Sequence, residues 1–310
     1  MGINSTVFPS KPEKKYFEHL KSIWGDKYRI YPNLPFLSVL NCENIFDLSV
    51  LNAPKPIKLK KIDIERLKKT SIDYTICDFS DKPILCIEFD GIQQGVNIGT
   101  KYFAGKNKNP WRNKIMNLKL KVAHGSAFPF FVMKSSQFEV FNNDDKLAIV
   151  DCVIGTVLSK NEMEKVFKEG FDPTEIGMTE EQFNSLSRKK QYEEFEKWAC
   201  GIEVVSYFNN SPIHKLAYEL QDKLKVEKAG YGPIEHPSLK FVSDRRKRSK
   251  LIKQINTLGY RAWVELPDGR TFNASVWVHD FDMPEFTPYA FVEELSLYLA
   301  LKKAQKKING

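Results

Sequence analysis

The pattern of apolar and polar positions is most informative over residues 71–91. Residues 72–77 (IDYTIC) and 84–89 (ILCIEF) are rich in β-branched and aromatic side chains, and a polar segment with turn chemistry separates them. This pattern predicts two strands joined by a short loop. Each strand carries one acidic residue among its apolar neighbours, Asp73 in the first and Glu88 in the second.

The two acidic residues are expected to face one another. If the loop closes symmetrically, with Cys77 paired to Ile84, Asp73 lies directly opposite Glu88 on the same side of the hairpin. Like charges so placed repel unless a positive group lies between them. Carboxylate oxygens are hard ligands that suit Mg²⁺ or Mn²⁺, so the pattern predicts a divalent-cation site.

A capping-box sequence predicts a helix over residues 10–24. Glu13 falls on the apolar face of this helix. It either only caps the helix or reaches the metal site as a further carboxylate. A strand over residues 28–31, closed by Pro32, is expected next, and residues 33–56 predict no clear element.

A second helix is predicted over residues 109–124, starting with Asn-Pro. Helical periodicity places Trp111 and Val122 on its apolar side and Lys119 on the buried flank, where a lysine needs a partner. Residues 128–133 then predict an apolar strand at the centre of a sheet. The order helix, strand, hairpin, helix, strand is typical of an α/β fold with a central mixed sheet flanked by helices.

The remainder of the chain predicts an α+β region. Helices are expected over residues 147–158, 161–172, 179–200, 211–223 and 288–301, a loop that can act as a hinge over 230–237, and a hairpin over 261–278. The expected domains are therefore a core over residues 1–160 and a C-terminal region over 161–310 that binds DNA or a partner.

Basic residues are concentrated in two runs. Residues 58–69 form either a solvated face or a surface that holds a phosphate backbone. The densest run begins a helix that is predicted to end at Gly259; it comprises Arg245, Arg246, Lys247, Arg248 and Lys250. Cations at a helix N-terminus oppose the macrodipole, so phosphate contact is the functional interpretation and a solvated surface is the alternative.

Composition narrows the class of protein. The 310 residues are 42% hydrophobic and carry a formal charge of +8, which is typical of a globular protein and favours a polyanionic partner. The five cysteines form no C-x-x-C pair, and neither a signal peptide nor an apolar run of membrane length is present. A cytoplasmic protein without a membrane partner is expected. The sequence contains no P-loop or dinucleotide fingerprint.

These residues together resemble a known family. Asp73, then Glu88-Phe89-Asp90-Gly91, then a helix with Lys119 and an apolar strand are similar to the PD-(D/E)XK restriction-endonuclease-like nuclease superfamily. The closest likeness is to the bacterial branch in which the strand reads E-x-D-G and the lysine lies on the following helix. The resemblance covers roughly residues 10–135. Asp90 occupies the position of the usual lysine, so Lys119 has to substitute for it.

The resemblance implies metal-assisted hydrolysis of a phosphodiester. Asp73, Glu88 and the Phe89 carbonyl would hold Mg²⁺ or Mn²⁺, with Asp90 either a further ligand or a turn residue. Lys119 would orient the attacking water, help to deprotonate it, or offset the charge of the transition state, and Glu13 would complete the site. Arg112, on the same helix as Lys119, and the second basic run are the candidate nucleic-acid contacts.

The expected function is that of a metal-dependent deoxyribonuclease, an endonuclease in defence, transposition or repair. The alternative is a non-catalytic nucleic-acid-binding or assembly subunit that retains the fold. The expected partners are DNA and either a second copy of the chain, because double-strand cutting needs two sites, or a larger defence or recombination complex.

Overall fold

The computed structural model describes residues 8, 10–43, 45–47, 55–90, 96–98, 101–103, 110–134, 140–142, 146–235, 243–247, 257–279 and 289–309. The chain divides into two compact units. Unit 1 comprises Met1–Asp151, Ile234–Gly259 and Trp277–Tyr289, and unit 2 comprises Cys152–Pro233, Tyr260–Val276 and Ala290–Gly310. Residue 160, the expected domain boundary, lies inside a helix.

The helices and strands follow one another in mixed order. They are α1 (Lys11–Trp24), β1 (Arg29–Pro35), α2 (Phe36–Val39), β2 (Phe46–Asp47), β3 (Lys55–Pro56), α3 (Lys61–Leu67), β4 (Ser71–Cys77), β5 (Pro83–Asp90), β6 (Val96–Ile98), β7 (Lys101–Phe103), α4 (Pro110–Gly125), β8 (Phe130–Lys134), β9 (Val140–Asn142), β10 (Leu147–Ala148), α6 (Ile149–Glu169), the 3₁₀ helix η1 (Pro173–Ile176), α7 (Glu180–Ser185), α8 (Arg188–Asn210), α9 (Pro212–Leu224), β11 (Lys228–Pro233), β12 (Thr257–Glu265), β13 (Thr271–His279) and α11 (Tyr289–Asn309).

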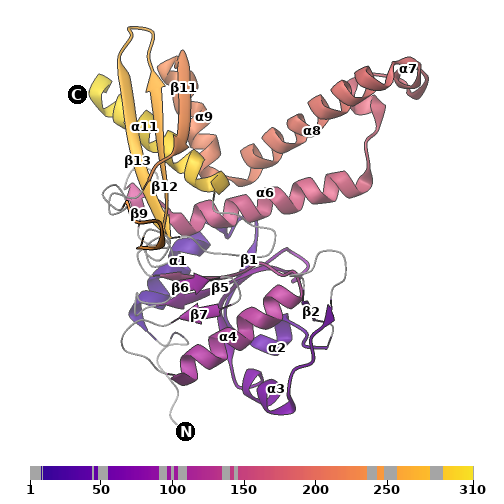
Figure 1. Cartoon of the computed structure of the whole chain (residues 1–310), viewed down its shortest axis with the longest axis vertical. Coiled ribbons are helices and arrows are strands. Elements are labelled where there is room, and N and C mark those ends of the chain that lie inside the picture. Colours follow the sequence, from indigo (N-terminus) through magenta and orange to yellow (C-terminus); the bar gives the residue numbers. More distant parts are fainter. Residues whose placement is uncertain are drawn as a thin grey trace. The chain divides into compact units, whose positions relative to one another are not determined.

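Unit 1 is built on a mixed four-stranded sheet with the strand order β1-β4-β5-β8. Of these strands, β1 and β5 are labelled in Figure 1. β4 pairs antiparallel with both β1 and β5, whereas β5 pairs parallel with β8 across the connection that contains α4. The expected α/β class with a mixed central sheet is therefore confirmed. The expectation that residues 128–133 form a central strand is wrong, because β8 ends the strand order in the described part of the sheet.

The two faces of this sheet pack against different helices. On one face, the Tyr16 ring of α1 lies 5.1 Å from the Phe89 ring of β5. On the other face, buried Leu120 of α4 belongs to the same apolar cluster as Cys86 and Phe130 of the sheet. Successive residues of β5 therefore point alternately to α1 and to α4.

The hairpin of β4 and β5 has most of the predicted register. Tyr74 pairs with Ile87 and Thr75 with Cys86, as the predicted alignment requires. The predicted pair at the loop end is wrong, because a bulge makes Cys77 pair with Pro83. The end of the hairpin that carries the acidic residues keeps its alignment.

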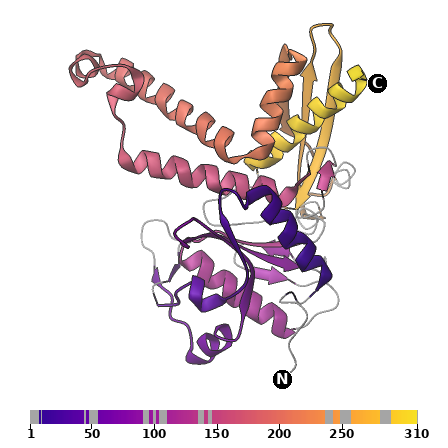
Figure 2. The ribbon, with the colours of Figure 1, turned by 180° about the vertical axis from the view of Figure 1, so that it is seen from behind.

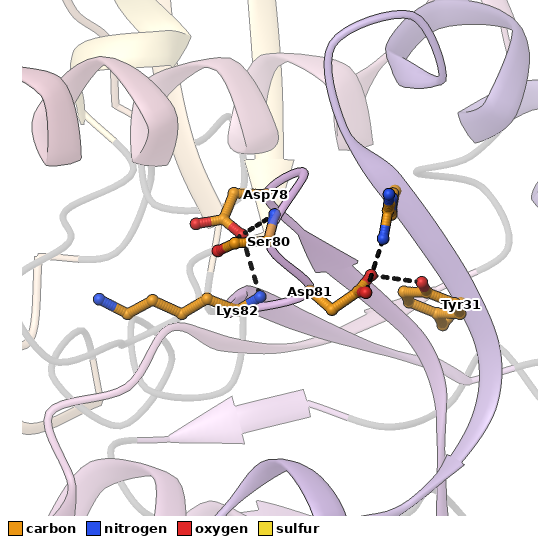
Figure 3. A network of polar contacts seen from close by, with 6 residues as sticks. Tyr31, Asp78, Ser80, Asp81 and Lys82 are labelled. Atoms are coloured by element: carbon orange, nitrogen blue, oxygen red, sulfur yellow. Dashed lines mark hydrogen bonds and ion pairs between the residues drawn. The ribbon is translucent and has the colours of Figure 1, made fainter.

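The loop between β4 and β5 is held by two aspartates. Asp78 accepts hydrogen bonds from the backbone N–H groups of Ser80 and Lys82, and Asp81 accepts one from Arg29 of β1 (Figure 3). These contacts satisfy the polar groups of a tight turn and tie it to the neighbouring strand. The loop is thus a structural feature at the opposite end of the hairpin from Asp73.

Two local predictions in unit 1 are wrong. β1 continues through Pro32, because the strand lies at the edge of the sheet, where a missing N–H donor is tolerated. Trp111 is 54% exposed instead of buried, and the Arg66 guanidinium stacks over its ring at 5.0 Å. Val122 and Lys119 are buried as predicted.

Unit 2 contains a long pair of helices. α6 is one continuous helix where two were predicted, whereas the segment predicted as a single helix over 179–200 divides into α7 and α8 because Ser187 caps a new start. α8 contacts α6 through Phe167 and Trp198, whose rings lie 5.5 Å apart, and the connecting segment with α7 lies at the far end of the pair (Figures 1 and 2).

Unit 2 also contains a three-stranded antiparallel sheet in the order β11-β12-β13. The predicted hairpin over residues 261–278 is confirmed. The prediction of a hinge loop is wrong for Gly230–Pro233, which belong to β11. The predicted helix end at Gly259 is also wrong, since β12 begins at Thr257. Among the described residues, no helix has the length and apolarity needed to span a bilayer.

Candidate functional site

Asp73 and Glu88 lie beside each other at one end of the β4–β5 hairpin. The Asp73 side chain, and not a backbone carbonyl, accepts the hydrogen bond of the Phe89 N–H, at 2.7 Å from Asp73 Oδ2. Glu88, the residue before Phe89, points to the α4 side of the sheet, where its Oε1 contacts Lys119. The strand pairing that the sequence predicts therefore brings both carboxylates to one place.

Lys119 supplies a positive group at this place. Its Nζ lies 2.6 Å from Glu88 Oε1 and also donates to the backbone carbonyl of Ser71 at 2.6 Å. The Lys119 and Glu88 side chains are only 6% and 7% exposed, so they form a buried ion pair. Lys119 thus lies on the inward side of α4, as the helical periodicity predicted.

A second cation of α4 contacts the next acidic residue of β5. Arg112 donates a hydrogen bond of 3.1 Å to Asp90 Oδ1, and Asp90 is buried. Arg112 and Lys119 are seven residues apart, which places them on one helix face. Their respective partners, Asp90 and Glu88, are two residues apart on one strand face. Arg112, predicted as a nucleic-acid contact, thus has an acidic partner within the site.

Lys134 is a site neighbour that sequence reasoning missed. It ends β8 and pairs in the parallel ladder with Asp90. Burial lowers the pKa of Lys134, and the charge of Asp90 acts in the opposite direction. The parallel pairing of β5 and β8 brings these residues together, and no local sequence signal specifies that pairing.

Glu13 lies at the N-terminal end of α1. Its backbone N–H donates to the Ser10 hydroxyl at 3.3 Å, and that hydroxyl donates to Glu13 Oε1 at 3.1 Å, so Ser10 caps the helix as predicted. Burial raises the pKa of Glu13, and the negative charge of Asp73 raises it further. Glu13 is therefore both part of the helix cap and an electrostatic neighbour of Asp73.

The carboxylates of the site are harder to ionise than free ones. Burial raises the pKa of Asp73, although the Phe89 N–H and the charge of Lys119 partly oppose this effect. Burial also raises the pKa of Glu88, the Asp73 charge adds to the rise, and Lys119 opposes it. Ionised forms of all these acids would thus be stabilised by additional positive charge.

The donor set fits Mg²⁺ or Mn²⁺ in its chemistry. Glu88 and Asp90 each have a cationic partner, whereas Asp73 and Glu13 have none among the described residues. Among those residues, no group of three or more carboxylate, histidine or cysteine side chains is arranged to hold a metal ion. Mg²⁺ is commonly held by one or two carboxylates together with water and substrate phosphate, which is the number that Asp73 and Glu88 supply.

The predicted basic surface of residues 245–250 is described only in part. Arg245, Arg246 and Lys247 form the exposed start of a helix, where Asp244 Oδ1 accepts from the Lys247 N–H. Arg248 and Lys250 lie outside the described residues.

Comparisons of the chain with protein-family models, with curated proteins and with solved structures find no match. The functional conclusion accordingly rests on the residues of the site and their surroundings.

Proposed function

We propose that this chain is a Mg²⁺-dependent nuclease that hydrolyses phosphodiester bonds in DNA, with the active site at Asp73, Glu88 and Lys119. The observation that carries the proposal is the buried contact of the Lys119 ammonium with Glu88, beside a second carboxylate that has no cationic partner in the described structure. An amine and two acids from three separate elements converge on one place.

Burying Lys119 and Glu88 costs desolvation free energy, so good packing alone does not explain why charged residues occupy these positions. Desolvating both charges of a buried ion pair offsets much of their attraction, and an apolar pair of similar volume is often at least as stable. Acids and amines with perturbed surroundings are concentrated at functional sites for this reason. The Glu88–Lys119 pair next to Asp73 fits that description.

Each residue of the site has a distinct role in the proposed reaction. The Phe89 N–H fixes one oxygen of Asp73, and Lys119 fixes one oxygen of Glu88, so each carboxylate keeps its other oxygen for a metal ion. A bound Mg²⁺ would supply Lewis-acid activation of water and neutralise phosphate charge. The Lys119 ammonium stabilises negative charge that develops on the phosphate, and Arg112 holds Asp90 in place.

The proposal is tested with Asp73→Asn. An asparagine at this position can still accept the hydrogen bond from the Phe89 N–H, so the fold is retained while one ionised ligand is lost. We expect plasmid nicking in Mg²⁺ to fall by about 100-fold or more, with the Tm in EDTA unchanged or higher. Glu65→Gln, which changes an exposed carboxylate on α3, should leave nicking unchanged.

Two outcomes would contradict the proposal. Nicking that survives both Asp73→Asn and Glu88→Gln would show that the active site does not lie at these carboxylates. Unmodified protein that binds DNA but never cleaves it with Mg²⁺ or Mn²⁺ would support the second candidate, a non-catalytic DNA-binding or assembly subunit. The absence of a group of three metal-binding side chains among the described residues favours that candidate. Defence, transposition or repair is the context in which we place either activity.

A further inference from the structure

One face of the unit 2 sheet is free of helices in the described structure. α9 and α11 cover the other face (Figures 1 and 2), and Ala262 and Val264 of β12 and Leu295 of α11 are each buried. Residues alternate between the two faces of a strand, so Arg261 and Trp263 point away from these helices, and both are exposed.

Trp263 lies flat against the neighbouring strand. It pairs with Gly230 of β11, and a Cβ added at Gly230 would lie 2.7 Å from Trp263 Nε1. The glycine therefore leaves the space in which the indole packs on the β11 backbone. Trp263 remains 38% exposed, so the opposite face of the ring is presented to solvent.

Polar side chains lie on the same sheet face as this indole. Arg261 donates through Nε to the Ser275 hydroxyl at 3.1 Å, which orients the guanidinium, and no carboxylate among the described residues pairs with it. Trp263 is thus an aromatic surface beside an arginine whose remaining N–H groups are available for an anion.

We propose that this sheet face binds single-stranded nucleic acid, with a base stacked on Trp263 and a phosphate held by Arg261. An exposed aromatic ring next to a cation on an open antiparallel sheet stacks unpaired bases of any sequence, whereas the bases of a duplex are stacked on one another and are not available. The positive charge of Arg261 is complementary to the phosphate backbone. The inference goes beyond the proposed cleavage, because binding here requires no metal ion and none of the unit 1 carboxylates.

The test measures binding by the full chain in EDTA, where no cleavage occurs. A fluorescein-labelled oligonucleotide of about 12 nucleotides, without self-complementarity, is titrated at several salt concentrations and compared with the matching duplex. We expect the single strand to bind more tightly and to quench tryptophan fluorescence. Trp263→Ala should weaken single-strand binding about 10-fold or more, and Arg261→Gln should weaken it and reduce its salt dependence.

Two glycines of β11 provide a matched pair of controls. Gly230→Ala should weaken binding with Trp263 still present, because the new methyl group displaces the indole. Gly232→Ala should bind normally, since a Cβ there has no neighbour within 4 Å. Tyr192→Ala, which removes an aromatic ring of α8 that is 62% exposed, should also bind normally.

The results separate this proposal from the nuclease proposal. Equal affinity of Trp263→Ala and unmodified protein, or equal effects of the two glycine substitutions, would overturn the sheet face as the binding surface. Tighter binding of the duplex would overturn the single-strand preference. Binding is measured in EDTA, where no cleavage occurs, so a failure of the unmodified protein to cleave DNA leaves this inference unaffected.

Discussion

Replacing Lys119 by methionine should destabilise the protein in a strongly pH-dependent way. The substitution keeps much of the side-chain volume but removes the only cation that contacts Glu88 in the described structure. Glu88 is then a buried carboxylate beside Asp73, with no counter-charge in contact. In the folded state the pKa of Glu88, already raised by burial and by Asp73, should rise further.

The size of the effect follows from the geometry of the pair. At a separation of 2.6 Å and an effective dielectric constant of about 20, the attraction between Lys119 and Glu88 is about 6 kcal/mol. Desolvation offsets part of this attraction in the intact pair. Removing one partner leaves the other charge buried, which typically costs about 3–5 kcal/mol. We expect Lys119→Met to lower the free energy of unfolding by this amount near pH 8.

An exposed ion pair of the same sheet provides the matched control. Arg29 and Asp81 are also 2.6 Å apart, but their side chains are 45% and 52% exposed. Because solvent screens exposed ion pairs, Arg29→Met should change the free energy of unfolding far less than Lys119→Met does. The two substitutions thus compare burial at a constant N···O distance.

The assay is urea unfolding in EDTA, followed by circular dichroism at pH 5 and pH 8. Protonation of Glu88 removes the unpaired charge, so the cost of Lys119→Met should shrink at pH 5. Adding Glu88→Gln to Lys119→Met should recover much of the lost stability at pH 8, which a double-mutant cycle measures. A cost below about 1 kcal/mol that does not change with pH would refute the buried-pair reasoning.

Two further predictions concern carboxylates of unit 1. Burial raises the folded-state pKa values of Glu88 and Asp73 above their unfolded values, so in EDTA their contribution to stability is present at low pH and is lost as pH rises through the folded values. Because Mg²⁺ needs the ionised forms, the rise in Tm that Mg²⁺ produces should grow between about pH 5 and about pH 8, and a pH-independent rise would contradict this site. Asp151 is buried and accepts hydrogen bonds from His19, the Trp24 indole and the Ala148 N–H. Asp151→Asn should therefore lower the free energy of unfolding by about 2 kcal/mol in urea titrations. An unchanged stability would show that these bonds are dispensable.

The parts of the fold that were predictable are those that local chemistry specifies. The register of Tyr74 with Ile87 and the cap of Ser10 on α1 follow from alternation and capping rules that involve neighbouring residues. Trp111 was placed incorrectly because stacking of Arg66 satisfies an exposed ring, a contact between α3 and α4 that helical periodicity does not contain. The continuity of α6 was missed because Ser159 and Asn161 are residue types that often begin a helix, whereas in the structure the Ser159 hydroxyl donates to the Gly155 carbonyl within the helix.

The site shows the same division between local and long-range information. The burial of Lys119 was predictable from its position among apolar residues of one helix. Its contact with Glu88 needed the packing of α4 on the sheet, and the neighbourhood of Lys134 and Asp90 needed the parallel pairing of β5 with β8. The Arg112–Asp90 contact could have been predicted from spacing. Two cations seven residues apart on a helix can face two acids that are two residues apart on a strand, which gives two ion pairs.

Because Lys119 and Arg112 belong to the same helix, both acidic partners on β5 depend on how that helix is docked. A local opening of α4 would leave both carboxylates without their cations at once, and their mutual repulsion would then favour closing. The apolar residues Met116, Leu120 and Ala123, which anchor α4, therefore also control the electrostatic balance of β5. Substitutions that loosen this anchor should alter the charge state of the sheet from a distance, without touching any ionisable group.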